Sequence, residues 1–391
     1  MKQFLAFFMA IGFCGCIALV VIWQISEHNH KAPKRPTPIV VNPPITPIPD
    51  IKEATYEEAL DSIKEADLKK DLYYLASDEL EGRMSGKQGN VMAAAFIKKQ
   101  YESFGLETAY QKFNIRRLNP GPKNETGDDF TQNVIAWIEG NDPILKNEII
   151  VIGAHMDHIG YGPSMSRAPS RRAIHPGADD NASGTVALMQ IARAFSMLKG
   201  KIKRTVVFQS YSAEEMGLIG SRYYCDHPLF PKENPSIRSH VFMLNMDMVG
   251  YLNKRASFSF ESADSSVDVG KIITELNKKY TFAKKITSRG TGGSDHASFY
   301  NKRVPIAFLH TGLHPYYHTP DDTADKINYN GIEQIAKYAF ELAYRVANDG
   351  ETPKFNNETF RAMEYTHDHG DVPFEHEHGG VPHNHGRDNQ N

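Results

Sequence analysis

The segment EIIVIGAHMDH, residues 148–158, continues without a polar residue from Ile149 to Ala154 and then ends in polar side chains. An unbroken apolar run of this length is typical of a strand that is buried on both faces, as in the parallel sheets of α/β proteins. Residues 185–198, further along, have apolar side chains three and four positions apart, which predicts a buried helix. Strand and helix together indicate an α/β fold.

The same alternation extends over most of the chain. Further strands are predicted at 130–140, 205–215, 239–251 and 304–311, and further helices at 56–77, 90–105, 266–280 and 331–349. Buried strands that alternate with helices favour a largely parallel sheet. Because the first strands are hairpin-like, we expect a mixed, centrally parallel β-sheet within one domain at residues 51–350.

The segments that flank this domain differ in composition. Residues 4–23 are uncharged and apolar, and about 20 such residues can span a bilayer as a helix. Since no small-residue cleavage pattern follows, we predict a signal anchor at 1–24, with a cleaved signal peptide or a lipidated Cys14 or Cys16 as alternatives. All three would export the remaining chain, so we expect a periplasmic or extracellular domain, tethered to the membrane by the N-terminal segment.

Two further segments are expected to have no packed core. Residues 25–50 are rich in proline and predict a semi-rigid linker. Residues 351–391 form a polar, His-rich tail that we expect to be disordered. Its histidines leave loose capture of Zn²⁺ or a similar ion as an alternative to a simple solvated tail.

The overall composition is that of an ordinary globular protein. The chain is 40% hydrophobic with a formal net charge of −3, which gives no basic signal for nucleic acid, and we expect no nucleic-acid partner. Outside the N-terminal segment the single cysteine is Cys225. It cannot form an intrachain disulfide there, and we expect a buried thiol.

Several predicted strands end in side chains that can bind a metal. Because ligands in open α/β sheets gather outside the carboxyl ends of the strands, these groups are expected to meet at one edge. The residues concerned are His155, Asp157 and His158, then Glu214 and Glu215, then Asp247, and finally His318 after the last strand.

The stretch HPGADDNASG, residues 175–184, enters the helix at 185–198 and lies at the same edge. One acidic or amide side chain is enough to cap a helix. A second carboxylate in the same turn invites a cation. The stretch alone is compatible with capping or with a metal site.

In these motifs the chain resembles the M28 family of co-catalytic zinc aminopeptidases. The resemblance covers residues 77–348 and implies the three-layer fold of that family, a mixed sheet sandwiched by helices. The motifs occur in the order SDELEGRMSG, GAHMDHIG, PGADDNASG, YSAEEMGLIGS, LNMDMVGY, GGSDHASF and YHTPDDT.

The resemblance implies two zinc ions and assigns a role to particular residues. His155 and Asp247 would hold one ion, Glu215 and His318 the other, and Asp180 would bridge them. Glu214 would act as the general acid and base. Asp157 would hydrogen-bond the outer nitrogen of His155 and fix its tautomer. The family pattern gives no ligand role to His158, His175, His310 or His314, and it implies a cis peptide bond after Asp180.

The expected function is removal of N-terminal amino acids from peptides by a metal-activated water. The family's oxyanion-stabilising tyrosine is replaced by Thr291, and Tyr316 and Tyr317 are candidates for its role because they precede His318. The adjacent residues of the Ser294–His296 motif are expected to frame the site. The loop with Arg167, Arg171 and Arg172 could line the entrance, although a solvated loop is the simpler interpretation.

Two other functions remain open. A glutaminyl cyclase of the same fold uses one zinc, and the intact pair of His155 and Asp247 argues against it. A membrane-tethered, non-catalytic zinc-binding homologue is the second alternative. Glu214 and the complete ligand set argue against that one.

Overall fold

The computed structural model describes residues 54–118, 129–162, 165–252, 258–261, 263–280, 284–287, 293–358 and 360. The predicted signal anchor and linker lie outside these residues, as does the tail beyond residue 360. Within the part that is described, no helix is both long enough and apolar enough to cross a membrane.

Eight strands of the described residues form one mixed sheet in the order β1-β2-β4-β3-β5-β8-β6-β7. The central strands β4, β3, β5 and β8 are parallel, whereas β1, β2 and β6 introduce antiparallel pairs. The predicted mixed, centrally parallel sheet is therefore confirmed. The strands are Glu107–Asn114 (β1), Phe130–Ile138 (β2), Ile149–His155 (β3), Thr205–Tyr211 (β4), His240–Met246 (β5), Phe258–Glu261 (β6), Lys284–Thr287 (β7) and Ile306–His310 (β8).

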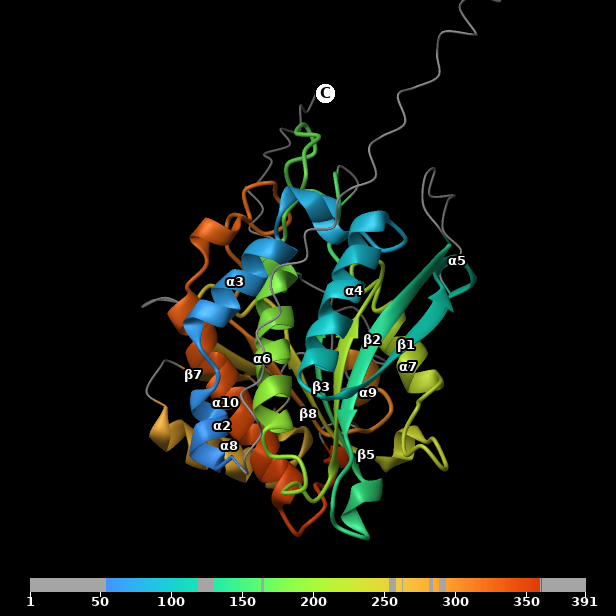
Figure 1. Cartoon of the computed structure of the whole chain (residues 1–391), viewed down its shortest axis with the longest axis vertical. Helices are drawn as coiled ribbons and strands as arrows, with labels where there is room; N and C mark the ends of the chain where they lie inside the picture. The colour runs from blue at the N-terminus through green and yellow to red at the C-terminus, as the bar shows by residue number, and fades with distance from the viewer. Residues whose placement is uncertain are drawn as a thin grey trace, which may run out of the picture. The chain divides into compact units, whose positions relative to one another are not determined.

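Helices cover both faces of this sheet, with α4 and α6 in front and α9 behind in the view of Figure 1. The α-helices are Tyr56–Asp61 (α2), Glu65–Leu75 (α3), Gln88–Ser103 (α4), Ile115–Leu118 (α5), Gly184–Ser196 (α6), Ile219–Asp226 (α7), Val267–Lys279 (α8), His296–Tyr300 (α9) and Tyr329–Asn348 (α10). Short 3₁₀ segments lie at Asp78–Arg83, Leu145–Asn147, Ile237–Ser239, Ala263–Ser265 and Ala324–Lys326, and a π-helical turn at Ala178–Ser183.

The central strand β3 shows why an unbroken apolar run is needed. Ile150 and Ile152 belong to the larger core, which they share with residues of α4, α6 and α10. Ile149 and Val151 point the other way, into a second core with residues of α7 and α9. Both faces of the strand are packed against apolar side chains. A strand with alternating polar and apolar residues would therefore leave buried polar groups unpaired. Cys225 is buried in the second core, as expected.

Several features of the fold differ from the sequence-based expectation, among them the unpredicted strands β6 and β7 and the unpredicted helices α5, α7 and α9. The helix predicted at 56–77 is two helices, because Lys64 adopts an extended conformation between α2 and α3 and Ile63 beside it is completely buried. The edge strand β1 was not predicted. Its residues are half exposed and lack an apolar run, so the sequence carries little strand signal there.

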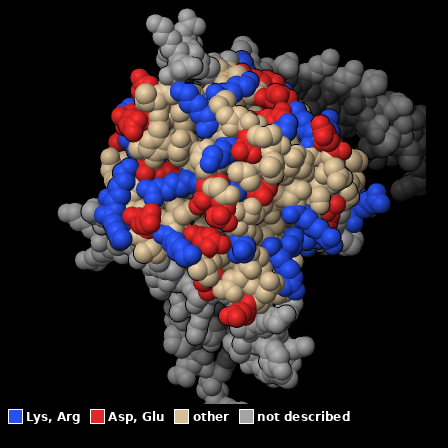
Figure 2. Space-filling view, turned by 90° about the horizontal axis from the view of Figure 1, so that it is seen from below, with Lys and Arg blue, Asp and Glu red and all other residues tan. Residues whose placement is uncertain are grey.

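The surface seen in Figure 2 carries Lys and Arg side chains interspersed with Asp and Glu. Basic side chains are not gathered into one patch on this face. This mixture of signs agrees with the formal net charge of −3.

The cluster of rings around Phe195 gives a test of the core. Phe195 is fully buried, with its ring 5.0 Å from that of Phe340 and 5.7 Å from that of Phe208. Phe195→Ala should lower the free energy of unfolding by about 3–5 kcal/mol, because it removes apolar contacts and leaves a cavity. Phe130 is 62% exposed, and Phe130→Ala should change the free energy of unfolding by less than about 0.5 kcal/mol. Urea denaturation of both variants measures the difference, and equal losses would contradict this description of the core.

Candidate metal centre

The carboxyl ends of the central strands bring the predicted residues together. His155 is the last residue of β3, Asp247 directly follows β5, and Glu214 and Glu215 lie three and four residues beyond the end of β4. Asp180 enters from the π-helical turn before α6. His318 comes from the loop after β8. These segments are far apart in sequence, and the sheet topology alone makes them neighbours.

One group of donors consists of His155, Asp180 and Asp247. The Nε2 atom of His155 lies 3.2 Å from Oδ1 of Asp247 and 3.4 Å from Oδ1 of Asp180. The three ligand atoms all lie within 4.8 Å of one another, and all three residues are buried. Imidazole nitrogen and carboxylate oxygen are the donors that zinc accepts in catalytic sites.

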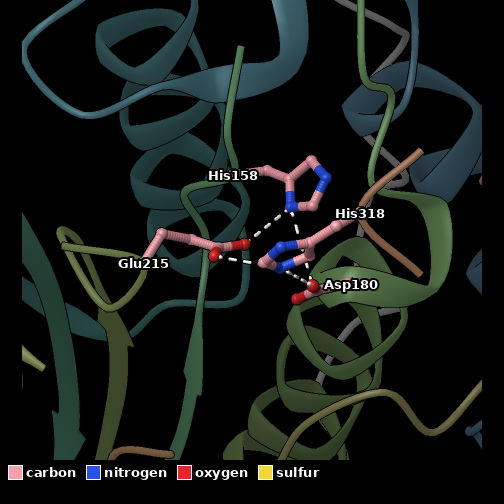
Figure 3. Close-up of side chains that lie close together, drawn as sticks. All are labelled: His158, Asp180, Glu215 and His318. Carbon is pink, nitrogen blue, oxygen red and sulfur yellow. Dashed lines mark hydrogen bonds and ion pairs between the residues drawn. The ribbon is translucent and has the colours of Figure 1, made fainter. Parts of the chain in front are cut away.

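A second group shares Asp180 and adds His158, Glu215 and His318, as Figure 3 shows. The Nε2 atom of His318 lies 3.0 Å from Oδ2 of Asp180 and 3.1 Å from Oε2 of Glu215. Asp180 therefore presents Oδ1 to the first group and Oδ2 to the second. A carboxylate in this position can link two cations.

The spacing between these donor atoms fits a metal site. Two ligands that each lie about 2.1 Å from one ion, at a tetrahedral angle, are about 3.4 Å apart. The four contacts of Asp180, Asp247 and Glu215 with His155 and His318 measure 3.0 to 3.4 Å. The residues present therefore suit a metal in donor type and in spacing.

His158 is one of the metal-capable side chains expected at the strand ends, but the family pattern gives it no ligand role, and the structure places it inside the second group. Its Nδ1 atom is 2.8 Å from Oε1 of Glu215 and 3.8 Å from Oδ2 of Asp180. Its Nε2 atom is buried and has no hydrogen-bond partner among the described residues. The spacing in HMDH, with a second histidine three positions after His155, was the available signal. A strand-end histidine is more often a satisfied polar residue, which is why that signal is weak.

Asp157 lies between His155 and Glu214. Its Oδ1 atom is 3.7 Å from Nδ1 of His155, and the backbone carbonyl oxygen of Asp157 is nearer, at 3.3 Å. The same Oδ1 atom accepts a hydrogen bond from the backbone N–H of Glu214 at 3.2 Å. The carboxylate thus connects the His155 loop with the Glu214 loop.

The Glu214 side chain lies in a strongly acidic environment. Burial raises the pKa of its carboxyl well above the usual range, and the negative charges of Glu215 and Asp247 act in the same direction, against the charge of His155. A carboxyl group with a raised pKa is better matched to accepting and returning a proton near neutral pH.

Asp180 has the opposite shift. Burial acts against its ionisation, but hydrogen bonds from His155 and His318 outweigh burial and hold the pKa of Asp180 well below its usual range. Burial acts against the charged form of His318, but its contacts with Asp180 and Glu215 raise the pKa of His318 to about 11. Imidazole and carboxylate therefore favour each other's charged form in this cluster.

The backbone around the site is held in uncommon conformations. Ala213, Met248 and His318 are non-glycine residues with φ of 58°, 52° and 54°, and Gly177 has φ of 57°. Each of them is a candidate ligand or lies one to three residues from one. Such strain clusters at functional sites. The Asp180–Asn181 peptide bond is cis, so the expectation of a cis bond after Asp180 is confirmed.

The neighbours of Asp180 shape the turn. Asp179 accepts hydrogen bonds from the backbone N–H of Gly250 at 2.6 Å and contacts Nε2 of His314 at 3.0 Å. The Asn181 side chain donates to the carbonyl of Met246 and accepts from the N–H of Gly184. Through these contacts Asp179 and Asn181 support the loop that carries Asp180.

The two tyrosines that precede His318 have different surroundings. The ring of Tyr317 stacks on the ring of His318 with centroids 3.9 Å apart, and the guanidinium carbon of Arg167 lies 4.8 Å from the Tyr317 centroid. Tyr316 instead lies under the Lys326 ammonium, 4.9 Å from its ring centroid. Tyr317 is therefore the tyrosine in contact with the second donor group.

The GGSDHASF motif lies beside the site. Ser294, Asp295 and His296 are fully buried. Ser294 accepts a hydrogen bond from Asn245, and the His296 ring stacks on Phe308 at 4.2 Å. This placement fits residues that frame the site. Thr291 lies outside the described residues.

Known proteins share this sequence pattern and fold. The chain is 33% identical over 216 residues to a probable leucine aminopeptidase of Arthroderma otae and 33% identical over 235 residues to leucine aminopeptidase 1 of Sclerotinia sclerotiorum. These matches cover 52% and 55% of the chain and 56% of each relative, so the chain spans little more than half the length of the curated relatives it matches.

Solved structures extend the likeness to the fold. The Legionella pneumophila LapA aminopeptidase is similar with a TM-score of 0.60 and 25% identity, over 78% of this chain and 79% of that one. The zinc aminopeptidase BSAP of Bacillus subtilis has the same fold with a TM-score of 0.60 at 18% identity, over 75% and 98% of the two chains. The model of peptidase family M28 matches residues 133–343, more than half of the sequence. The chain therefore belongs to peptidase family M28.

Proposed function

We propose that this chain is a di-zinc exopeptidase that removes N-terminal amino acids from peptides. The observation that carries the proposal is the position of Asp180, whose two carboxylate oxygens face two separate groups of histidine and carboxylate donors. The names of the relatives, leucine aminopeptidases, support an aminopeptidase. By the same likeness, a large apolar N-terminal residue such as leucine is the proposed substrate side chain.

The proposed ligands divide between the two ions. His155 and Asp247 would hold one zinc, Glu215 and His318 the other, and Asp180 both. When bound, zinc polarises a carbonyl group and lowers the pKa of a coordinated water to about 7. Three carboxylates offset three of the four positive charges. The His158 side chain lies 2.8 Å from Glu215. We propose that it either orients the Glu215 carboxylate or binds the same zinc ion.

Glu214 is the proposed general base and acid. It would take a proton from the attacking water and return it to the leaving amine. The backbone N–H of Glu214 is held by Asp157, which keeps the base next to the metal ligands. Tyr317 is the proposed donor to the developing oxyanion, because it contacts His318 whereas Tyr316 does not stack on it.

The domain boundaries and location are also proposals. We propose a signal anchor or signal peptide at 1–24, a linker at 25–50, the peptidase domain at 51–350 and a His-rich tail at 351–391. The apolar N-terminal run supports export to the periplasm or the cell exterior, with the membrane as the site of attachment.

The role of Glu214 can be separated from metal binding. Glu214→Gln keeps the size of the side chain but cannot accept a proton, so it should retain both zinc ions and lower kcat by about 10²- to 10⁴-fold. Hydrolysis of leucine aminoacyl reporters, together with zinc content by elemental analysis, measures both quantities. Near-normal hydrolysis in this variant would exclude Glu214 as the base.

The shared position of Asp180 predicts the metal count. Asp180→Ala should lose tight binding of both ions, whereas Asp247→Ala should lose one and keep the other. Asp321 lies in an exposed ion pair with Arg171, and Asp321→Ala is the matched control that should leave zinc content and activity unchanged.

One zinc per chain in the unaltered protein, with formation of pyroglutamate, would instead favour the cyclase. Stoichiometric zinc with no hydrolysis of any aminoacyl reporter would favour the non-catalytic homologue.

A further inference from the structure

The SDELEGRMSG motif contains a buried cation that the proposed mechanism does not use. Arg83 ends the 3₁₀ segment Asp78–Arg83 and is 1% exposed. Among the described residues no carboxylate oxygen lies within ion-pair distance of its guanidinium group. The guanidinium group donates instead to four backbone carbonyl oxygens.

These four carbonyls belong to three different segments. Nε donates to Met156 at 3.0 Å, directly after the proposed ligand His155. Nη1 donates to Pro176 at 2.6 Å and also to Leu75 at the end of α3. Nη2 donates to Gly177 at 2.9 Å, three residues before Asp180. One side chain therefore ties the His155 loop to the Asp180 loop.

The backbone beside Arg83 reinforces the same connection. Residues 81–83 all have positive φ, between 47° and 68°. The Gly82 carbonyl accepts from Gly160 at 3.0 Å. A Cβ atom at Gly82 would lie 2.5 Å from the carbonyl oxygen of His175, so the tight turn that aims Arg83 requires glycine here.

Asp322 completes the connection on the other side of Asp180. It is 2% exposed and lies four residues after His318 in YHTPDDT. Its carboxylate accepts hydrogen bonds from the backbone N–H of Asp179 at 3.0 Å and of Asp180 at 3.1 Å. The His318 loop is therefore bound to the Asp180 loop through main-chain groups.

We propose that Arg83 is a positioning residue of the metal centre, which together with Asp322 sets the spacing of the three ligand loops before any metal binds. The inference rests on the proposed function, because it takes His155, Asp180 and His318 as ligands. A planar guanidinium with five donors can satisfy four carbonyls in fixed directions. Lysine has one ammonium group and cannot.

A second buried arginine provides a matched control. Arg204, directly before β4 and thus at the opposite edge of the sheet, is also completely buried. It donates to the Glu148 carboxylate and to the backbone carbonyls of Val346, Asp349 and Glu351. Both arginines cross-link separate segments by donating to backbone carbonyls, and Arg204 in addition pairs with a carboxylate. Arg204 contacts none of the proposed ligand loops.

The test compares R83K with R204K in the full chain. We expect both variants to lower the unfolding midpoint, because each loses buried hydrogen bonds. R83K should in addition weaken zinc affinity by about 10- to 100-fold, as measured by competition with a chromophoric chelator. R204K should leave zinc affinity unchanged within about twofold. The absorption spectrum of bound Co²⁺ should change in R83K and not in R204K, since it reports ligand geometry.

Zinc affinity in R83K equal to that of the unaltered protein, or an equal loss in R204K, would overturn the inference. Should R83K fail to fold, D322A decides in its place, because alanine has no acceptor for the N–H groups of Asp179 and Asp180. Unchanged affinity in D322A would then reject the inference. A protein that binds zinc but hydrolyses no peptide would refute the proposed function and leave the test of Arg83 intact, because affinity is measured without substrate.

Discussion

Repulsion between carboxylates is the constraint on which this site depends. Asp180 lies within 3.4 Å of both His155 and His318, Asp247 lies 3.2 Å from His155, and Glu215 lies 3.1 Å from His318. Carboxylates gathered in this way cannot all remain ionised without nearby positive charge. The depressed pKa of Asp180 and the raised pKa of His318 have the same cause, because the carboxylate and the imidazole each favour the charged form of the other. Metal cations bound between these carboxylates and imidazoles would supply the same positive charge.

The rest of the fold holds these mutually repelling carboxylates close together. The parallel strands end at one edge, and the two dry faces of β3, packed between helical layers, leave the edge little freedom to relax. Loops with positive φ then turn the ligands inward. Helix α6 begins directly below Asp180, where Gly184 permits contact with the Met246 carbonyl that a Cβ atom would obstruct. Partial positive charge at the start of that helix further favours the carboxylate.

Much of the fold and most of the site could be anticipated from the sequence, for identifiable reasons. An apolar run such as 149–154 is stable only as a strand that is buried on both faces. The polar residues that follow it then lie at the edge of the sheet. Weaker signals failed. The half-exposed strand β1 has no apolar run, and the break at Lys64 follows from the burial of Ile63, a tertiary effect. The position of His158 and the four carbonyl contacts of Arg83 arise from loop geometry, which a one-dimensional pattern does not contain.

The unpredicted strand β1 has a consequence of its own. It forms one edge of the sheet in the part of the chain that is described, and an uncovered edge offers free amides and carbonyls to a strand of another molecule. Glu107 and Lys112 are exposed along it, and Glu107 pairs with Lys232 at 2.8 Å. Desolvating such charges would make the addition of a strand from another molecule costly at this border of the sheet.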